Sequence, residues 1–181
     1  MNKTYLLDTN ALFNYVKYKI TYSSLDTESQ KIIDELEGNK CYISEITTIE
    51  IVSVLGKYAR GGLGAAKKMK TKQIKAWKKL IDQILNQDKE NDFKIEIIQF
   101  DRKVLKKANK IIQSAYKYSF ASMDAIIAAT ACIYFDSIES KDKYIVTSDK
   151  SLICALSANN IPYWNAFICK VWSLTMIVAN V

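Results

Sequence analysis

The chain has 181 residues, 49% of them hydrophobic, and this length indicates one folded domain, because chains divide only when a single core stops growing, at roughly 250 residues. The formal charge of +7, from 26 lysines and arginines against 19 acidic residues, favours a polyanionic partner such as nucleic acid or an anionic membrane surface. Histidine is absent, which excludes Ser-His-Asp and Cys-His catalysis, zinc held by histidine and a histidine general base.

In the first third of the chain, short apolar segments alternate with amphipathic ones. The segment 4–7 is apolar and ends at Asp8, which is typical of a strand, and apolar residues then recur at helical spacing. Gly38 and Asn39 form a pair that commonly ends a helix. The sequence therefore predicts strands at 4–7 and 41–43, and helices at 11–20, 27–38 and 47–58.

The alternation continues through the rest of the chain, beginning with a lysine-rich segment. Trp77, Leu80 and Ile81 fall on one side of a helix over 65–87, and the lysines fall on the other side. Asp101 can cap the helix that follows it. We expect strands at 94–100, 144–147 and 161–164, and helices at 65–87, 101–117, 122–135 and 150–157.

Five short strands alternating with helices predict an α/β fold with a mainly parallel sheet covered on both faces, since each parallel crossover requires a helix. Sheets of this kind bind ligands beyond the carboxyl ends of their strands, where the strand order reverses. Asp8 and Asp149 both come just after predicted strands. We therefore expect the chemistry of the protein at this edge of the sheet.

Four acidic residues near the ends of predicted elements each have an ordinary structural interpretation. Asp8 and Asp149 could cap the helices that follow them. Glu50 lies three residues after Thr47, so the two could form a capping box. Asp124 lies near a helix start, where the helix dipole favours a negative charge. Taken one at a time, none of the four indicates a function.

Their combination indicates a metal site, because two carboxylates at strand ends and two near helix starts could converge at one rim of the same sheet. Carboxylates packed together repel, and their pKa values rise unless a cation neutralises them. A hard divalent ion such as Mg²⁺ or Mn²⁺ binds oxygen ligands. It can lower the pKa of a bound water and stabilise charge on a phosphodiester, so a hydrolase without histidine could work in this way.

The motifs around these carboxylates, taken in order, resemble the PIN domain family. They read Leu-Leu-Asp-Thr-Asn at 6–10, Ser-Glu-Ile-Thr-Thr-Ile-Glu at 44–50, Ser-Met-Asp-Ala-Ile-Ile-Ala-Ala-Thr-Ala at 122–131 and Ile-Val-Thr-Ser-Asp-Lys-Ser-Leu at 145–152. The resemblance spans residues 4 to about 165. It implies a three-layer α/β/α sandwich around a parallel sheet and endoribonuclease activity that depends on Mg²⁺ or Mn²⁺.

Carried over by position, the resemblance assigns both catalysis and metal binding to Asp8, Glu50, Asp124 and Asp149. Supporting polar roles fall to Asn10, Thr147 and Ser148. Glu45 is acidic too, but its spacing does not match the family's motif.

The best-known small members of this family are toxins of the VapC kind, each paired with an antitoxin that inserts into the acidic groove. The chain is longer than such toxins, through a lysine-rich helical segment at about 65–88 and an extension after about 165. We expect residues 1–181 to form a single PIN-like domain that hydrolyses RNA, either as a toxin with an antitoxin partner or as an RNA-processing factor. Small PIN-like proteins often dimerise, so a homodimer is one option.

Positive charge is concentrated in two stretches without acidic residues. The first runs from Ile51 to Ile81, and we expect it to contact RNA phosphates, which gives affinity without sequence readout. The residues assigned to this role are Lys67, Lys68, Lys70, Lys72 and Lys75. The second stretch carries Arg102, Lys103, Lys106, Lys107, Lys110 and Lys117. The alternative in both cases is an ordinary solvated helix face.

The cysteines and the apolar termini have simple interpretations. Cys41, Cys132, Cys154 and Cys169 are widely spaced among apolar residues without a C-x-x-C pair, which predicts reduced core residues. The apolar run at the amino terminus is too short for a signal peptide. Lys170 and Asn165 interrupt the stretch 161–181 below the roughly 18 to 20 residues that cross a bilayer. We expect a cytoplasmic protein without a membrane partner.

Two other functions compete with the nuclease. One is a non-catalytic RNA-binding or assembly module on the same fold. The other is a phosphatase that uses Asp8 as its nucleophile, as enzymes similar to haloacid dehalogenase do. Those enzymes usually carry a second aspartate two residues later, where this chain has Asn10, so the phosphatase is disfavoured.

Overall fold

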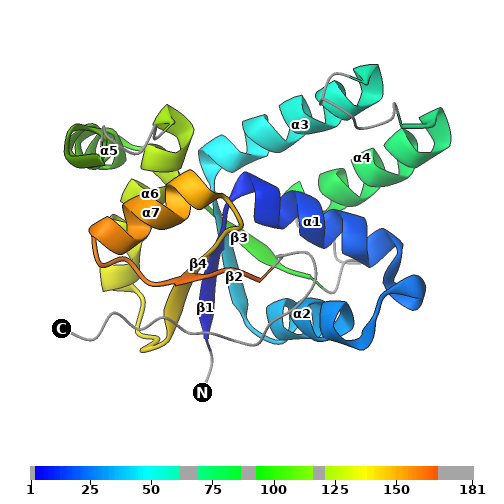
Figure 1. The fold of residues 1–181 in the computed structure, drawn as a ribbon, viewed down its shortest axis with the longest axis horizontal. Coiled ribbons are helices and arrows are strands. Elements are labelled where there is room, and N and C mark those ends of the chain that lie inside the picture. The colour runs from blue at the N-terminus through cyan, green and yellow to red at the C-terminus, as the bar shows by residue number, and fades with distance from the viewer. Residues whose placement is uncertain (1–2, 62–68, 87–92, 116–120, 167–181) are drawn as a thin grey trace.

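The computed structural model describes residues 3–61, 69–86, 93–115 and 121–166. Its strands are β1 (Thr4–Leu7), β2 (Lys40–Ser44), β3 (Ile95–Ile98), β4 (Lys143–Val146) and β5 (Tyr163–Trp164). They form one sheet in the order β3-β2-β1-β4-β5, in which all neighbouring strands are parallel (Figure 1). The order reverses at β1, whose neighbours in the sheet are β2 and β4.

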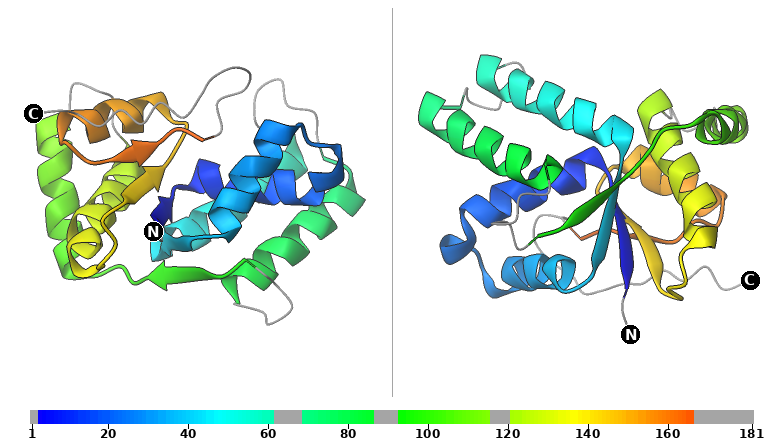
Figure 2. Two further views of the ribbon diagram at one scale, coloured as in Figure 1. Left: turned by 90° about the horizontal axis from the view of Figure 1, so that it is seen from below. Right: turned by 180° about the vertical axis from the view of Figure 1, so that it is seen from behind.

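Helices cover both faces of this sheet, as Figure 2 shows from two further directions. They are α1 (Thr9–Ile20), α2 (Thr27–Glu37), α3 (Glu45–Arg60), α4 (Thr71–Leu85), α5 (Arg102–Ala115), α6 (Ser122–Tyr134) and α7 (Lys150–Ala158), with short 3-10 turns η1 (Tyr22–Ser24) and η3 (Phe135–Ser137). The three-layer α/β/α sandwich expected from the sequence is confirmed.

The alternation of side chains along the central strands divides the interior into two cores. On β1, Tyr5 and Leu7 face a core that is completed by α1, α2, α3 and α4, whereas Leu6 faces a core completed by α5, α6 and α7. All four residues of β1 are buried, as expected for a central parallel strand covered on both sides. After β5 the alternation continues, because Trp164 and Ala166 pack in the first core and Tyr163 packs in the second.

All five expected strands are present, and most differences from the expectations concern the ends of elements. The helix expected from 47 begins at Glu45. The lysine-rich helix expected from 65 begins at Thr71, after the non-helical residues Met69 and Lys70, while 65–68 lie outside the described residues. The strand expected at 94–100 is confined to β3, and Asp101 caps α5 by accepting the Val104 N–H at 2.8 Å, as expected.

The cysteines follow the expectation only in part. Cys41 is buried and Cys132 is partly buried, and both are free thiols. Cys154 is also free, but it is exposed, so its prediction as a core residue is wrong. The reason is that α7 buries Leu152, Ala155 and Leu156 on its inner face, and Cys154 falls outside that face. Cys169 lies outside the described residues.

No helix in the four described ranges is long and apolar enough to pass through a membrane.

Candidate active site

Asp8 lies at the carboxyl end of β1, in the middle of the sheet. Its backbone N–H donates to the Val146 carbonyl at 3.1 Å. One oxygen of its side chain, Oδ1, accepts the Ala11 N–H at 2.5 Å and so caps α1, and the Thr147 side chain is a further hydrogen-bond partner. The residue is only 3% exposed. The capping role considered from the sequence is therefore real, and the structure places the same carboxylate in a buried position.

Thr147 and Asp149 continue the same edge of the sheet from β4. The Thr147 hydroxyl accepts the Asp149 N–H at 3.0 Å and is also hydrogen-bonded to Asp8. Asp149 caps α7, because its Oδ1 accepts the Leu152 N–H at 2.8 Å. Thr147 thus joins the turn that carries Asp149 to the carboxylate of Asp8.

Glu50 reaches this edge from α3, and its contacts exclude the capping box considered from the sequence. The N-cap of α3 is Ser44, so Thr47 lies inside the first turn of the helix. The buried Thr47 hydroxyl has no hydrogen-bond partner within the described residues. Glu50 instead accepts a hydrogen bond from the Thr9 hydroxyl through Oε2. Thr9, next to Asp8 in the sequence, is a site residue that the motif analysis did not single out.

A small hollow brings three of the four predicted carboxylates together. Asp124 lies in the first turn of α6, and the hollow between it and the start of α1 has a volume of about 50 Å³. The lining residues are Asp8, Thr9, Asn10, Glu50, Val54, Asp124 and Ile127. Asp149 does not line the hollow, but it is close enough to act electrostatically on both Asp8 and Asp124.

Burial and mutual repulsion raise the pKa of two of these carboxyl groups. Loss of water raises the pKa of Asp8 to about 7, with a smaller upward effect of Asp124 and Asp149 that is opposed by the hydrogen bond from Thr147. Burial, followed by repulsion from Asp149 and Glu50, raises the pKa of Asp124 to about 6. Both shifts have the direction expected of carboxylates that share a small volume with little water.

The donors around the hollow fit a hard divalent cation. Carboxylate oxygens are the ligands that Mg²⁺ and Mn²⁺ prefer, and the volume exceeds the roughly 10–15 Å³ that one water molecule requires. However, no three acidic or cysteine side chains within the described ranges are close enough to hold one ion together. Three carboxylates can therefore share an ion only after at least one side chain rotates.

The remaining predicted residues fall into two groups. Asn10 lines the hollow and is exposed, and Ser148 is partly buried beside Asp149. Glu45, rejected by its spacing, does not line the hollow, and its Oε2 accepts the Phe100 N–H at 2.9 Å. That bond ties the segment after β3 to the start of α3.

The lysines assigned to RNA contact lie at the far end of α3 and α4, which extend together from the sheet (Figure 1). The Met69 N–H donates to the Tyr58 carbonyl at 3.3 Å, and Tyr58 lies eight residues after Glu50, or about 12 Å along the helix at roughly 1.5 Å per residue. The exposed residues concerned are Lys70, Lys72 and Lys75. Lys67 and Lys68 lie outside the described residues.

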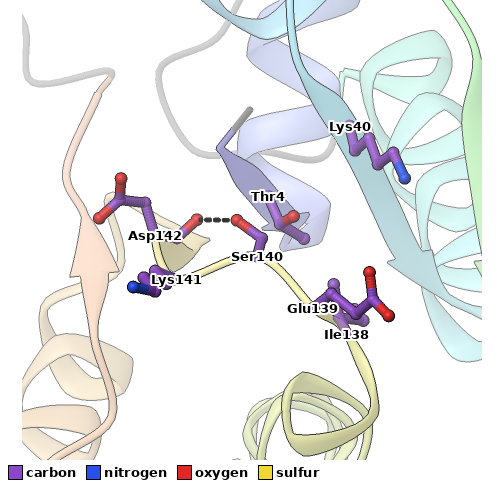
Figure 3. A pocket seen from close by; sticks show the side chains of 7 residues that line it. All are labelled: Thr4, Lys40, Ile138, Glu139, Ser140, Lys141 and Asp142. Carbon is purple, nitrogen blue, oxygen red and sulfur yellow. Dashed lines mark hydrogen bonds between the residues drawn. The ribbon is translucent and has the colours of Figure 1, made fainter. Parts of the chain in front are cut away.

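A larger hollow, of about 430 Å³, lies at the opposite end of the strands (Figure 3). It is bounded by the amino ends of β1 and β2 and by the loop before β4. Its lining residues are Thr4, Lys40, Ile138, Glu139, Ser140, Lys141 and Asp142. Two lysines and two acidic residues are mixed there without a carboxylate cluster. Because parallel sheets bind ligands at the carboxyl ends of their strands, we place the candidate active site at the smaller hollow.

The sequence matches the family model described as "PIN domain" over residues 5–155. Since this match covers most of the chain, the protein belongs to the PIN domain family. None of the curated proteins matches the sequence at a significant level.

Several solved structures share the fold. FitAcB from Neisseria gonorrhoeae is 23% identical over 90% of this chain and 97% of that chain, with a TM-score of 0.53. FitAB bound to the IR36 DNA fragment is 21% identical, over 92% and 98% of the two chains, with a TM-score of 0.53. VapBC2 from Rickettsia felis, bound to a DNA fragment from its promoter, is 17% identical, over 84% and 92%, with a TM-score of 0.51. At these identities the likeness concerns the fold alone.

The raised pKa of Asp8 gives a prediction for the metal-free protein. In the folded chain the pKa is about 7, against an ordinary value of 3.8, so between these pH values the folded state retains a proton that the unfolded state has lost. Stability from such a group is fully present below 3.8 and is lost as the pH rises through about 7. We expect Asp8→Asn to remove this contribution, which amounts to a slope of up to roughly 1.4 kcal/mol per pH unit.

The measurement is urea denaturation of both proteins in chelator across this pH range. Asp26→Asn is a matched control, because Asp26 also caps a helix, accepting the Ser29 N–H at 2.7 Å, but is exposed and has a lowered pKa. Its curve should run parallel to that of the wild type between about pH 5 and pH 7, because an aspartate with a lowered pKa is deprotonated there in both the folded and the unfolded state. A parallel curve for Asp8→Asn would contradict the burial of the Asp8 charge.

Proposed function

We propose that the protein is a metal-dependent endoribonuclease that hydrolyses RNA phosphodiester bonds. Nuclease activity is general in the PIN domain family to which the chain belongs. The observation that carries the proposal for this chain is the meeting of Asp8, Glu50 and Asp124 around one hollow, with Asp149 acting on two of them. A carboxylate cluster without a paired lysine or arginine is costly to bury unless a cation accompanies it.

Asp8, Glu50, Asp124 and Asp149 would hold Mg²⁺ or Mn²⁺, the kind of ion that PIN nucleases generally use. When bound, such an ion supplies Lewis-acid stabilisation of the phosphodiester and a means of activating water. The protein contributes the orientation of its carboxylates. Glu50 is held through one oxygen by Thr9 and Asp149 through one oxygen by the start of α7. Within the described residues, the second oxygen of each of these two carboxylates makes no hydrogen bond.

RNA would approach between two basic helices, α4 and α5, which lie on opposite sides of β1 in Figure 1. The first lysines of α4 lie near the carboxyl end of α3, which is remote from Glu50. The face of α5 that carries Arg102, Lys103 and Lys106 is exposed. This helix begins shortly after the carboxyl end of β3, at the same edge of the sheet as Asp8. Proximity therefore favours α5 for contacts with the phosphates nearest the scissile bond.

The resemblance to VapC toxins supports a protein partner as well. An antitoxin would have to meet four acidic side chains at the hollow, so a segment with arginine or lysine is the chemistry that fits. On this view the protein is the toxin of a pair. An RNA-processing role without such a partner uses the same site.

One observation favours a different function, a non-catalytic RNA-binding or assembly module on the same fold. In the described part of the chain, no three carboxylates converge closely enough to share an ion. If they cannot rotate into such an arrangement, the fold would retain basic surfaces without a metal centre. Calorimetric titration that detects no Mn²⁺ binding at millimolar concentrations would select this module.

The nuclease predicts cleavage of single-stranded or structured RNA by the purified protein with Mn²⁺ or Mg²⁺ and loss of cleavage in excess chelator. Asp124→Asn should lower the rate by about 100-fold, since it removes one of the carboxylates that would hold the cation. Circular dichroism should show that the variant remains folded. Wild-type cleavage that persists in chelator would refute the metal mechanism.

Two variants on α3 test whether cleavage depends on Glu50 in particular or on any acidic residue of this helix. Glu50→Gln should reduce cleavage strongly, because Glu50 lines the hollow. Glu45→Gln makes the same chemical change five residues earlier, and its amide oxygen can still accept the Phe100 N–H, so its rate should stay near that of the wild type. Equal losses in the two variants would contradict the assignment of Glu50.

Two triple variants test which basic helix binds RNA. Lys103, Lys106 and Lys110 on α5, and Lys72, Lys75 and Lys79 on α4, are all exposed, and each set can be changed to glutamine. We expect the α5 variant to raise KM more and to lower the salt dependence of RNA binding, by about 0.7 in log–log slope for each lost phosphate contact. A larger loss in the α4 variant would instead assign RNA to the lysines that the sequence first indicated.

A further inference from the structure

Asn165 occupies a position in the sheet that neither the motifs nor the proposed mechanism uses. It follows β5 directly, and β5 is the neighbour of β4. Backbone hydrogen bonds link the ends of β1, β4 and β5. The Asp8 N–H donates to the Val146 carbonyl at 3.1 Å, and the Thr147 N–H donates to the Trp164 carbonyl at 3.2 Å. Asp8, Thr147 and Asn165 are therefore equivalent positions on three neighbouring strands.

The three side chains also belong to the same face of the sheet. The residues two positions earlier, Leu6, Ile145 and Tyr163, all pack in the core beneath α5, α6 and α7. Because side chains alternate along a strand, the residues at 8, 147 and 165 project toward this face. The hydrogen bond between Asp8 and Thr147 agrees with that arrangement. Asn165 is thus the third polar residue in a row along the carboxyl edge.

The side-chain oxygen of Asn165 is buried without a hydrogen-bond partner in the described part of the chain. Nearly all buried polar atoms in proteins have a partner, and those without one need an explanation. The backbone of Asn165 lies two strand spacings from that of Asp8, or about 10 Å. Its nearest site neighbour in the row is Thr147, whose hydroxyl contacts both Asp8 and the Asp149 N–H.

We infer that Asn165 is a positioning residue of the candidate active site. With the cation bound, this oxygen, which has no partner within the described residues here, accepts a hydrogen bond from the turn 147–149 or from a water molecule that the turn holds. The bond fixes Thr147 in the orientation that directs Asp8 and Asp149 toward one cation. This inference rests on the proposed metal-dependent function. The bond adds a restraint on the turn that carries Asp149 to the helix caps that already hold one oxygen of Asp8 and of Asp149.

Substitution by leucine tests the inference, because leucine has a similar size and no hydrogen-bonding oxygen. In calorimetric titrations of the full chain, we expect Asn165→Leu to weaken Mn²⁺ binding by about tenfold, within the range found when a residue that orients a metal ligand is removed. In RNA cleavage, kcat should fall while KM stays unchanged, since the oxygen is buried and does not touch RNA. The melting temperature in chelator should stay near that of the wild type.

A control and a rescue variant separate positioning from packing. Asn159 is also partly buried and belongs to the other end of α7, where its side chain donates to the Ala155 carbonyl at 2.8 Å. Asn159→Leu should leave the Mn²⁺ affinity unchanged. Asn165→Asp keeps the oxygen acceptor, and we expect its Mn²⁺ affinity to remain within about threefold of the wild type or to become tighter through the added charge.

A double-mutant cycle tests whether Asn165 acts through Thr147. Thr147→Val keeps the shape of the side chain and removes the hydroxyl that joins Asp8 to the Asp149 turn. If the two residues act as one unit, Asn165→Leu should change the Mn²⁺ affinity of Thr147→Val by less than about threefold, because coupled substitutions are not additive. A full tenfold further loss in this background would overturn the proposed route through Thr147.

The outcomes distinguish this inference from the proposed function. Wild-type protein that binds Mn²⁺ and cleaves RNA, together with an Asn165→Leu variant that does both equally well, would overturn the role of Asn165 and leave the nuclease intact. Wild-type protein that does not bind Mn²⁺ at millimolar concentrations would overturn both. If the leucine variant does not fold, Asn165→Ala provides the same comparison, since it only truncates the side chain.

Discussion

The burial of the Asp8 carboxylate at the carboxyl end of the central strand is the constraint on which the rest of the site depends. A charge in that position is costly unless hydrogen bonds or a cation compensate for it. The fold supplies two hydrogen bonds, from the first turn of α1 and from Thr147. Burial, and to a smaller extent the neighbouring carboxylates, act in the opposite direction and raise its pKa. The protein therefore holds this group in a state that a divalent cation would stabilise.

Structural and chemical roles are combined in the same side chains here. Asp8 and Asp149 each cap a helix through one oxygen, which fixes the direction of the carboxylate as well as the start of the helix. Glu50 is held by Thr9, so α1 positions two of the carboxylates, one as its cap and one through its first residue. The sequence presented helix capping and metal binding as alternatives for Asp8 and Asp149. The two roles are compatible, because a carboxylate that caps a helix through one oxygen keeps its second oxygen for a cation.

Packing explains why the basic helices lie where they do. Phe13 of α1 stacks on Tyr58 of α3 at 4.8 Å between ring centroids and contacts Trp77 of α4 at 4.6 Å. These rings join α3 and α4 to the helix that Asp8 caps. On the other side, α5 packs on α6, whose first turn carries Asp124. Each basic helix is thus packed, directly or through one neighbour, on an element that supplies a carboxylate.

The sequence by itself determined the elements and the kind of chemistry. Hydrophobic periodicity is a local property, and it predicted five strands, a parallel sheet and the strand ends at which Asp8 and Asp149 lie; the motif order indicated the PIN family. Only the tertiary structure decided which alternatives hold, because contacts between distant residues depend on how elements pack. It excluded the capping box of Thr47 and Glu50, gave Glu50 its bond to Thr9, assigned Glu45 to Phe100 and exposed Cys154. It also placed Asn165 in one row with Asp8 and Thr147, a relation between three strand ends that no local pattern contains.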